Sequence, residues 1–105
     1  MTAKSRKQQI QEMLAEEPTD AFLRYGLAME FVSEANDADA VREFRELFAV
    51  APKYVPAYHQ AGQAFLRLNR TVEAREVLRQ GIDMAMKQGD QHAAAEMEEL
   101  LAGLG

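Results

Sequence analysis

Residues 55–88, VPAYHQAGQAFLRLNRTVEAREVLRQGIDMAMKQ, decide the fold of this chain. In the first half of the stretch, small and apolar residues recur with the spacing of one helix face: Tyr58, Ala61, Gly62 and Phe65. The second half has the same spacing at Ala74, Val77, Leu78 and Ile82. Only Leu68, Asn69 and Arg70 separate the two halves. So short a join favours an antiparallel helical hairpin.

The preceding residues repeat this pattern with a period of 34 residues. The aligned positions are Pro18 with Pro52, Ile10 with Phe44 and Leu78, Ala28 with Gly62, Phe31 with Phe65, and Ala40 with Ala74. Loop positions align with loop positions, and no alternating strand pattern competes. The chain therefore contains an earlier copy of the hairpin at 21–54.

A helix–turn–helix unit of this length, with a small residue where its helices cross and a proline after the second helix, resembles the tetratricopeptide repeat (TPR) family. The resemblance implies an all-α fold, a right-handed superhelical stack of antiparallel helix pairs with about six helices. We expect a single domain over 1–105. Its parts are a half-repeat helix at 4–17, repeats at 21–54 and 55–88, and a capping helix at 90–102.

Several local features follow from this alignment. Met86 stands where the family pattern has a proline, so the fifth helix is expected to continue to Lys87 or Gln88. Gly89 should end it and Asp90 should start the last helix. We expect N-caps at Asp37 and Thr71, helix crossings at Ala40 and Ala74, a packing reason for Gly62, and an exposed Glu73.

Composition excludes several classes of function. The 105 residues include no cysteine, 48% are hydrophobic, and the net charge is −5. Disulfides and thiolate metal sites are excluded, and an acidic balance disfavours nucleic acid as a partner. We find no signal-peptide pattern and no run of about 18 apolar residues, so we predict a cytoplasmic protein without a membrane partner.

Residues suited to catalysis or metal binding are sparse. The two histidines, His59 and His92, lie in no known ligand motif, and His92 and Glu96 share a helix face at a spacing that offers only two ligands. Ser5 and Ser33 stand in no nucleophile motif. We therefore predict no metal, no cofactor and no enzymatic activity.

Positive charge gathers in the second repeat, at Arg67, Arg70, Arg75 and Arg79. Glu73 and Glu76 lie within helical reach of these arginines. Ordinary surface ion pairs are favoured over an anion-binding patch.

The opening helix of the first hairpin is apolar on two faces. One stripe, Leu23, Leu27, Ala28 and Phe31, is needed for packing between repeats. A second stripe follows the spacing 3, 4, 3 at Phe22, Tyr25, Met29 and Val32. In the resembled family, first helices line a concave groove that contacts partners. The alternative, of about equal weight, is that flanking helices bury this second stripe.

We therefore predict a non-catalytic module that binds a peptide or helix segment of another protein in a concave groove. The partner-binding residues predicted for this groove are Phe22, Tyr25, Met29, His59, Gln63 and Arg67. The first three should hold an apolar anchor, and the last three should contact an acidic or polar neighbour. The alternative is a structural subunit that associates with a second copy of itself as a homodimer.

Overall fold

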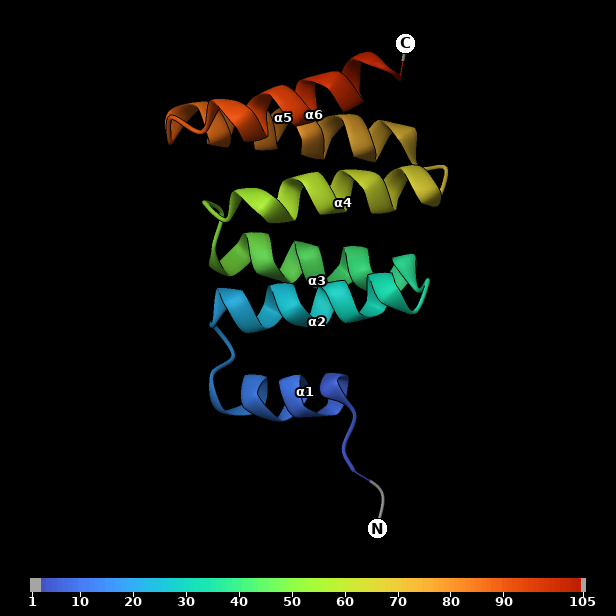
Figure 1. Cartoon of the computed structure of the whole chain (residues 1–105), viewed down its shortest axis with the longest axis vertical. Helices are drawn as coiled ribbons and strands as arrows, with labels where there is room; N and C mark the ends of the chain where they lie inside the picture. Colours follow the sequence, from blue (N-terminus) through green and yellow to red (C-terminus); the bar gives the residue numbers. More distant parts are fainter. Residues whose placement is uncertain (1–2, 105) are drawn as a thin grey trace.

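The computed structural model describes residues 3–104, which form six α-helices and no strand (Figure 1). In chain order, the helices are α1 (Arg6–Glu16), α2 (Ala21–Ser33), α3 (Asp37–Val50), α4 (Val55–Arg67), α5 (Thr71–Lys87) and α6 (Gln91–Ala102). The predicted all-α class with about six helices is confirmed.

The helices stack along the long axis of a molecule that measures 51 × 28 × 20 Å. Helix α1 lies at one end, and α5 and α6 lie together at the other (Figure 1). Helices α2 and α3 fall within the range 21–54, and α4 and α5 fall within 55–88. The assignment of those ranges as two repeats stays a prediction.

The turns inside the two hairpins share one backbone conformation. Ala35 and Asn69 both occupy the left-handed region, with φ of 58° and 59°. The residue after each donates its amide to a carbonyl five positions back: Asn36 N–H to Phe31 O and Arg70 N–H to Phe65 O, both 2.9 Å. This is the Schellman pattern, which satisfies carbonyls at a helix end. The repeat in the sequence is therefore also a repeat in backbone geometry.

A third turn of this kind joins α5 to α6. Gly89 has φ of 74°, and Asp90 N–H donates to Ala85 O at 2.8 Å. Helix α5 continues to Lys87 and Asp90 caps α6, as predicted. Met86 lies within α5, so the helix runs past the position where a proline would stop it, and the turn at Gly89 leads into α6. The α1–α2 and α3–α4 joins contain Pro18 and Pro52 instead.

Two predicted N-caps are wrong by one residue. Asn36, and not Asp37, caps α3, because its Oδ1 accepts the amide of Asp39 at 3.2 Å. Asp37 is the first helical residue, and its carboxylate is free to pair with a distant side chain. Thr71 likewise begins α5, and no side chain caps that helix.

Small residues lie where the helices cross. Ala40 and Ala74 are fully buried, as predicted. A Cβ atom on Gly62 would lie 2.5 Å from Cδ2 of Leu78, which is the expected packing reason for that glycine. Gly81 is tighter, because its Cβ would meet the Tyr58 side chain and lie 2.6 Å from Sδ of Met97. These contacts set the spacing between neighbouring helices.

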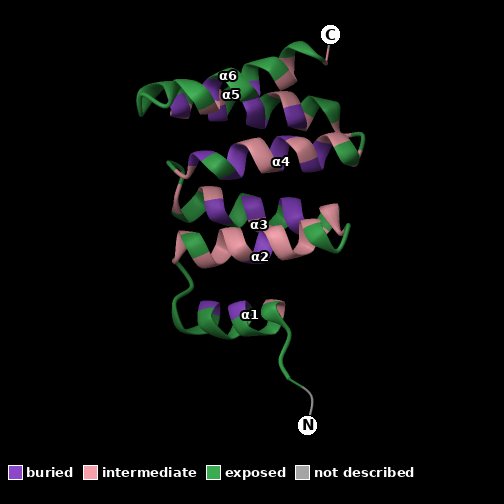
Figure 2. Cartoon of the chain, viewed as in Figure 1, coloured by how far each residue is buried: buried purple, intermediate pink, exposed green. Residues whose placement is uncertain are grey.

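Two hydrophobic clusters form the core (Figure 2). The larger runs from α2 to α6, and its largest fully buried side chains are Phe44, Leu47, Leu78 and Met97. The smaller contains Ile10, Leu14 and Leu27 and joins α1 to α2. Most of α1 is exposed, whereas α4 is largely buried (Figure 2). Helix α1 is therefore held by a small apolar contact of its own.

We predict that Ala74→Leu lowers the free energy of unfolding by about 1–3 kcal/mol, because the larger side chain would overpack the crossing. The matched control is Ala49→Leu on α3, because Ala49 is exposed and its replacement should change stability little. Glu73 would be a poor control: it is half-buried between Arg45 and Arg70, contrary to our expectation. Equal effects in urea denaturation would contradict the assigned packing.

A pair of glycines gives opposite expectations for the same substitution. A Cβ on Gly26 would lie an ordinary 3.5 Å from Cδ1 of Ile10, so Gly26→Ala should stabilise the protein by up to about 1 kcal/mol through helix propensity. Gly81→Ala should destabilise it, because Tyr58 and Met97 leave no room. Thermal melting of the two variants checks this, and a shared direction of change would refute it.

Candidate functional site

The six residues predicted to bind a partner fall in three places. Phe22, Tyr25 and Met29 line a groove between α1 and α2. His59 and Gln63 line a separate hollow between α4 and α6. Arg67 lines neither of them. The predicted groove residues therefore lie in two separate depressions, with Arg67 outside both.

The α1–α2 groove has a volume of about 610 Å³. Its lining is Arg6, Gln9, Ile10 and Met13 from α1, and Phe22, Leu23, Tyr25, Gly26, Met29, Glu30 and Ser33 from α2. Apolar side chains from both helices line it, and two of its charged lining residues, Arg6 and Glu30, pair at 2.9 Å. The α1 residues were not among the predicted ones, because a helix pattern does not show which flank of a neighbour stays open.

Tyr25 lines this groove and is held in place by two aromatic neighbours. Its ring stacks on Tyr54 with centroids 5.2 Å apart and lies tilted against Phe44 at 6.2 Å. Burial raises the pKa of the Tyr25 hydroxyl, and the neighbouring Tyr54 raises it further. Tyr25 thus contributes to the core as well as to the groove lining, so flanking residues bury at least this member of the second apolar stripe. Contact of the stripe with a partner stays a prediction.

Phe22 and Met13 are the exposed apolar side chains of the groove. Phe22 is 75% exposed and Met13 is 45% exposed. They come from different helices and line the same groove. An aromatic ring so exposed at the edge of an apolar groove is a common feature of interaction surfaces.

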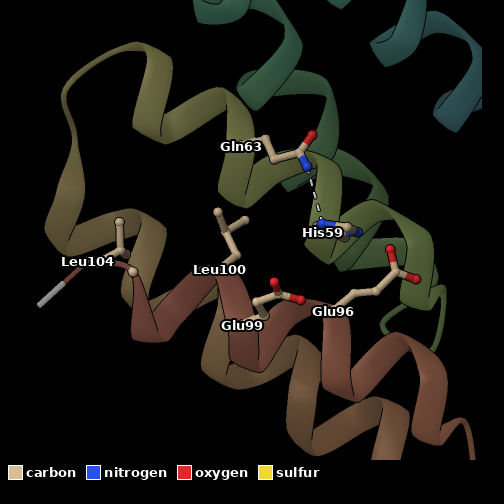
Figure 3. Close-up of a pocket in the computed structure, with 7 residues that line it drawn as sticks. His59, Gln63, Glu96, Glu99, Leu100 and Leu104 are labelled. Carbon is tan, nitrogen blue, oxygen red and sulfur yellow. Dashed lines mark hydrogen bonds between the residues drawn. The ribbon is translucent and has the colours of Figure 1, made fainter.

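The α4–α6 hollow is more polar, with a volume of about 490 Å³ (Figure 3). His59 and Gln63 project from α4, and their side-chain nitrogens lie 3.1 Å apart. Glu96, Glu99 and Leu100 project from α6, while Gly103 and Leu104 complete the lining. Neither glutamate was among the groove residues predicted from the sequence. They give this hollow acidic rather than cationic character.

Arg67 is engaged elsewhere. Its guanidinium makes a forked contact with the Asp37 carboxylate, with N···O distances of 2.9–3.0 Å. This contact joins the end of α4 to the start of α3. Arg70 similarly pairs with Glu73, which also meets Arg45. The predicted ion pair with a helical neighbour is confirmed for Arg70, whereas Arg67 pairs with a distant and largely buried carboxylate instead.

The described residues offer little to bind a metal. Over 3–104, no three His, Cys, Asp or Glu side chains gather as metal ligands would. His92 Nε2 lies 2.7 Å from Glu96 Oε1 in an exposed pair on α6. None of the six helices has the length and apolar character needed to cross a membrane.

Solved structures resemble this chain closely. A tetratricopeptide repeat domain protein from Salinibacter ruber, determined in solution, is 35% identical over 82% of this chain and 87% of its own, with a TM-score of 0.76. A crystal structure of such a protein from Salinibacter ruber is 34% identical over 80% and 93%, with a TM-score of 0.74. The chain belongs to the tetratricopeptide repeat family. It is a helical-repeat module of the kind that mediates contacts between proteins, and TPR domains are in general non-catalytic.

A third structure extends the likeness of fold. A protein from Bordetella parapertussis superimposes with a TM-score of 0.84 over 97% of this TPR chain and 89% of its own, at 22% identity. A sequence identity of 22% supports a shared fold and carries no information on function. Neither a family model nor a curated protein gave a match.

The position of Arg67 generates a prediction about its role. Arg67→Ala should lower the free energy of unfolding by about 0.5–1 kcal/mol, because it removes a forked ion pair with a largely buried carboxylate. Arg67→Lys should recover only part of this, because an ammonium cannot reproduce the forked contact. Urea denaturation of both variants provides the measurement. No loss in Arg67→Ala would show that the pair does not stabilise the α3–α4 contact.

Proposed function

We propose that this TPR module binds a peptide or helix segment of a partner protein, without catalysis. The observation that carries the proposal is the α1–α2 groove, where Phe22 is 75% exposed beside an apolar lining. Burying such a ring in a complex gains binding free energy, whereas leaving it in water gains nothing. The groove residues also sit on helices, so docking costs the module little ordering entropy.

The partner segment proposed here has two parts. An apolar anchor occupies the α1–α2 groove against Phe22, Tyr25 and Met29. A second part, rich in hydrogen-bond donors, reaches the α4–α6 hollow, where Glu96 and Glu99 offer carboxylates beside His59. This differs from the acidic neighbour expected from the sequence, because α6 supplies acceptors and Arg67 is paired with Asp37.

The alternative is self-association through the same groove. A second copy inserting Phe22 would also cover the exposed ring and give a closed dimer. Light scattering across a concentration series separates the two functions. A mass of 11.8 kDa for the chain alone at every concentration, together with binding of a partner segment in a separate titration, supports the first. A dimer that resists dilution supports the second.

We predict that Phe22→Ser weakens the partner segment about tenfold or more, because it removes the exposed aromatic contact. The matched control is Val72→Ser on α5, since Val72 is 71% exposed and lies outside both the groove and the hollow. The measurement is titration calorimetry with a segment mapped from a protein captured in the native cell. Tyr25→Ala is less informative, because Tyr25 also packs on Tyr54.

Two results would count against this function. Equal affinity of Phe22→Ser and Val72→Ser would remove Phe22 from the binding surface. Chemical shifts confined to α3 or α5 on adding the segment would place the contact on another face of the stack.

A further inference from the structure

Helices α1 and α3 hold equivalent positions along the chain, but α3 packs on both α2 and α4, whereas α1 packs on α2 alone among the described residues. The shift of 34 residues pairs Gln9 with Glu43, Ile10 with Phe44, and Met13 with Leu47. On α3, this flank receives α2: the Tyr25 ring lies against Phe44 at 6.2 Å, and Arg24 pairs with Glu43 at 3.0 Å. The structure thus contains one example of what covers such a flank, an antiparallel α-helix.

On the corresponding flank of α1, Ile10 is buried against α2, but no helix among residues 3–104 covers Gln9 and Met13. Leu47 is fully buried, whereas its equivalent Met13 is 45% exposed. Gln9, the equivalent of Glu43, is exposed and lines the groove. The α1–α2 groove therefore has the position relative to α1 that α2 takes relative to α3.

We propose that the α1–α2 groove is the binding site for an amphipathic α-helix from a partner protein. This helix packs on α1 as α2 packs on α3, and so completes a helical hairpin with α1. The inference rests on the proposed function and specifies the form of the apolar anchor. It extends an interface that the molecule already uses between its own helices.

Charges around the groove define the direction and chemistry of the partner helix. An adjoining hollow of about 340 Å³ shares Gln9 and Met13 and adds Glu12 and Glu16, towards the C-terminal end of α1. Glu12 pairs with Lys4 at 2.7 Å, so Glu16 supplies most of the negative charge there. Arg6 lies at the opposite end, where it pairs with Glu30 at 2.9 Å while its side chain stays 79% exposed. A helix antiparallel to α1 places its positive N-terminal end beside the glutamates and its negative C-terminal end beside Arg6. The partner helix accordingly carries an apolar stripe flanked by lysine or arginine.

Gly26 provides a way to close the groove without removing any contact. It lies in the middle of α2 and lines the groove, and its Cβ position is only in ordinary contact with Ile10. The equivalent residue of the next hairpin is Gln60. Gly26→Gln thus introduces a side chain that this fold already accepts at that position, and it should improve helix propensity. Ala49→Gln, at an exposed site of α3, is the matched control.

The experiment uses the full chain and a synthetic probe. The probe is an alanine-based helical peptide of about 15 residues, with leucines at helical spacing on one face and lysines along its flank. Calorimetry gives its affinity, and NMR gives the residues whose amide signals shift. We expect shifts on α1 and α2, and a loss of affinity of about tenfold or more in Gly26→Gln but not in Ala49→Gln. Replacing the lysines by glutamates should weaken binding.

A spin label on the peptide tests direction. A label at its N-terminal end should broaden the amide signals near Glu16, and a label at its C-terminal end should broaden those near Arg6. The reverse pattern, unchanged affinity in Gly26→Gln, or shifts confined to α4 and α6 would each overturn the inference. A dimer whose interface contains Phe22 and Met13 would assign the groove to a second copy and would also overturn it.

The native partner segment separates this inference from the proposed function. If that segment binds the wild type and Gly26→Gln with equal affinity, the proposal that the groove binds a partner helix is wrong, while the proposed binding function stands. If no partner segment binds the chain, the proposed function fails. Binding of the probe peptide then shows only that the groove accepts an amphipathic helix.

Discussion

The close approach of antiparallel helices at small side chains is the constraint on which this structure depends. At Gly62 and Gly81 there is no space for a Cβ atom, and Ala74 is fully buried. Because the helices meet there, larger rings can pack beside the crossings, as Phe48 does on Tyr58 with centroids 4.2 Å apart. The same spacing fixes which faces of α2 and α4 remain available to a partner.

Those contacts also explain why the fold could be predicted from the sequence. Helical spacing, short joins and small residues at crossings act over neighbouring residues, so they leave a visible pattern with a period of 34. The helix starts were less certain for a local reason. Asn36 and Asp37 are both good capping residues, and adjacent candidates cannot be separated without the backbone geometry.

The candidate site was harder to predict, because its composition depends on the rotation of whole helices. The turn at Gly89 sets how α6 faces α4, and this orientation brings Glu96 and Glu99 into the hollow beside His59. Arg67 pairs with an aspartate 30 positions earlier, a distance that no helix periodicity encodes. Phe22, Tyr25 and Met29 could be selected from one helix alone, since they share a stripe. Their neighbours on α1 could not.

The two ends of the stack differ in what contact with another molecule would gain. On α6, Met97 is fully buried, and the exposed positions include Glu96, Glu98 and Glu99. Covering those carboxylates would remove their hydrating water. This costs free energy unless cationic groups of the partner pair with them. On the α1 side, the exposed Phe22 and Met13 would lose only unfavourable contact with water, at roughly 25 cal/mol for each Å² covered. Under the proposed function, affinity therefore arises mainly at the α1–α2 groove, and the polar α4–α6 hollow selects among partners that already carry a suitable apolar anchor.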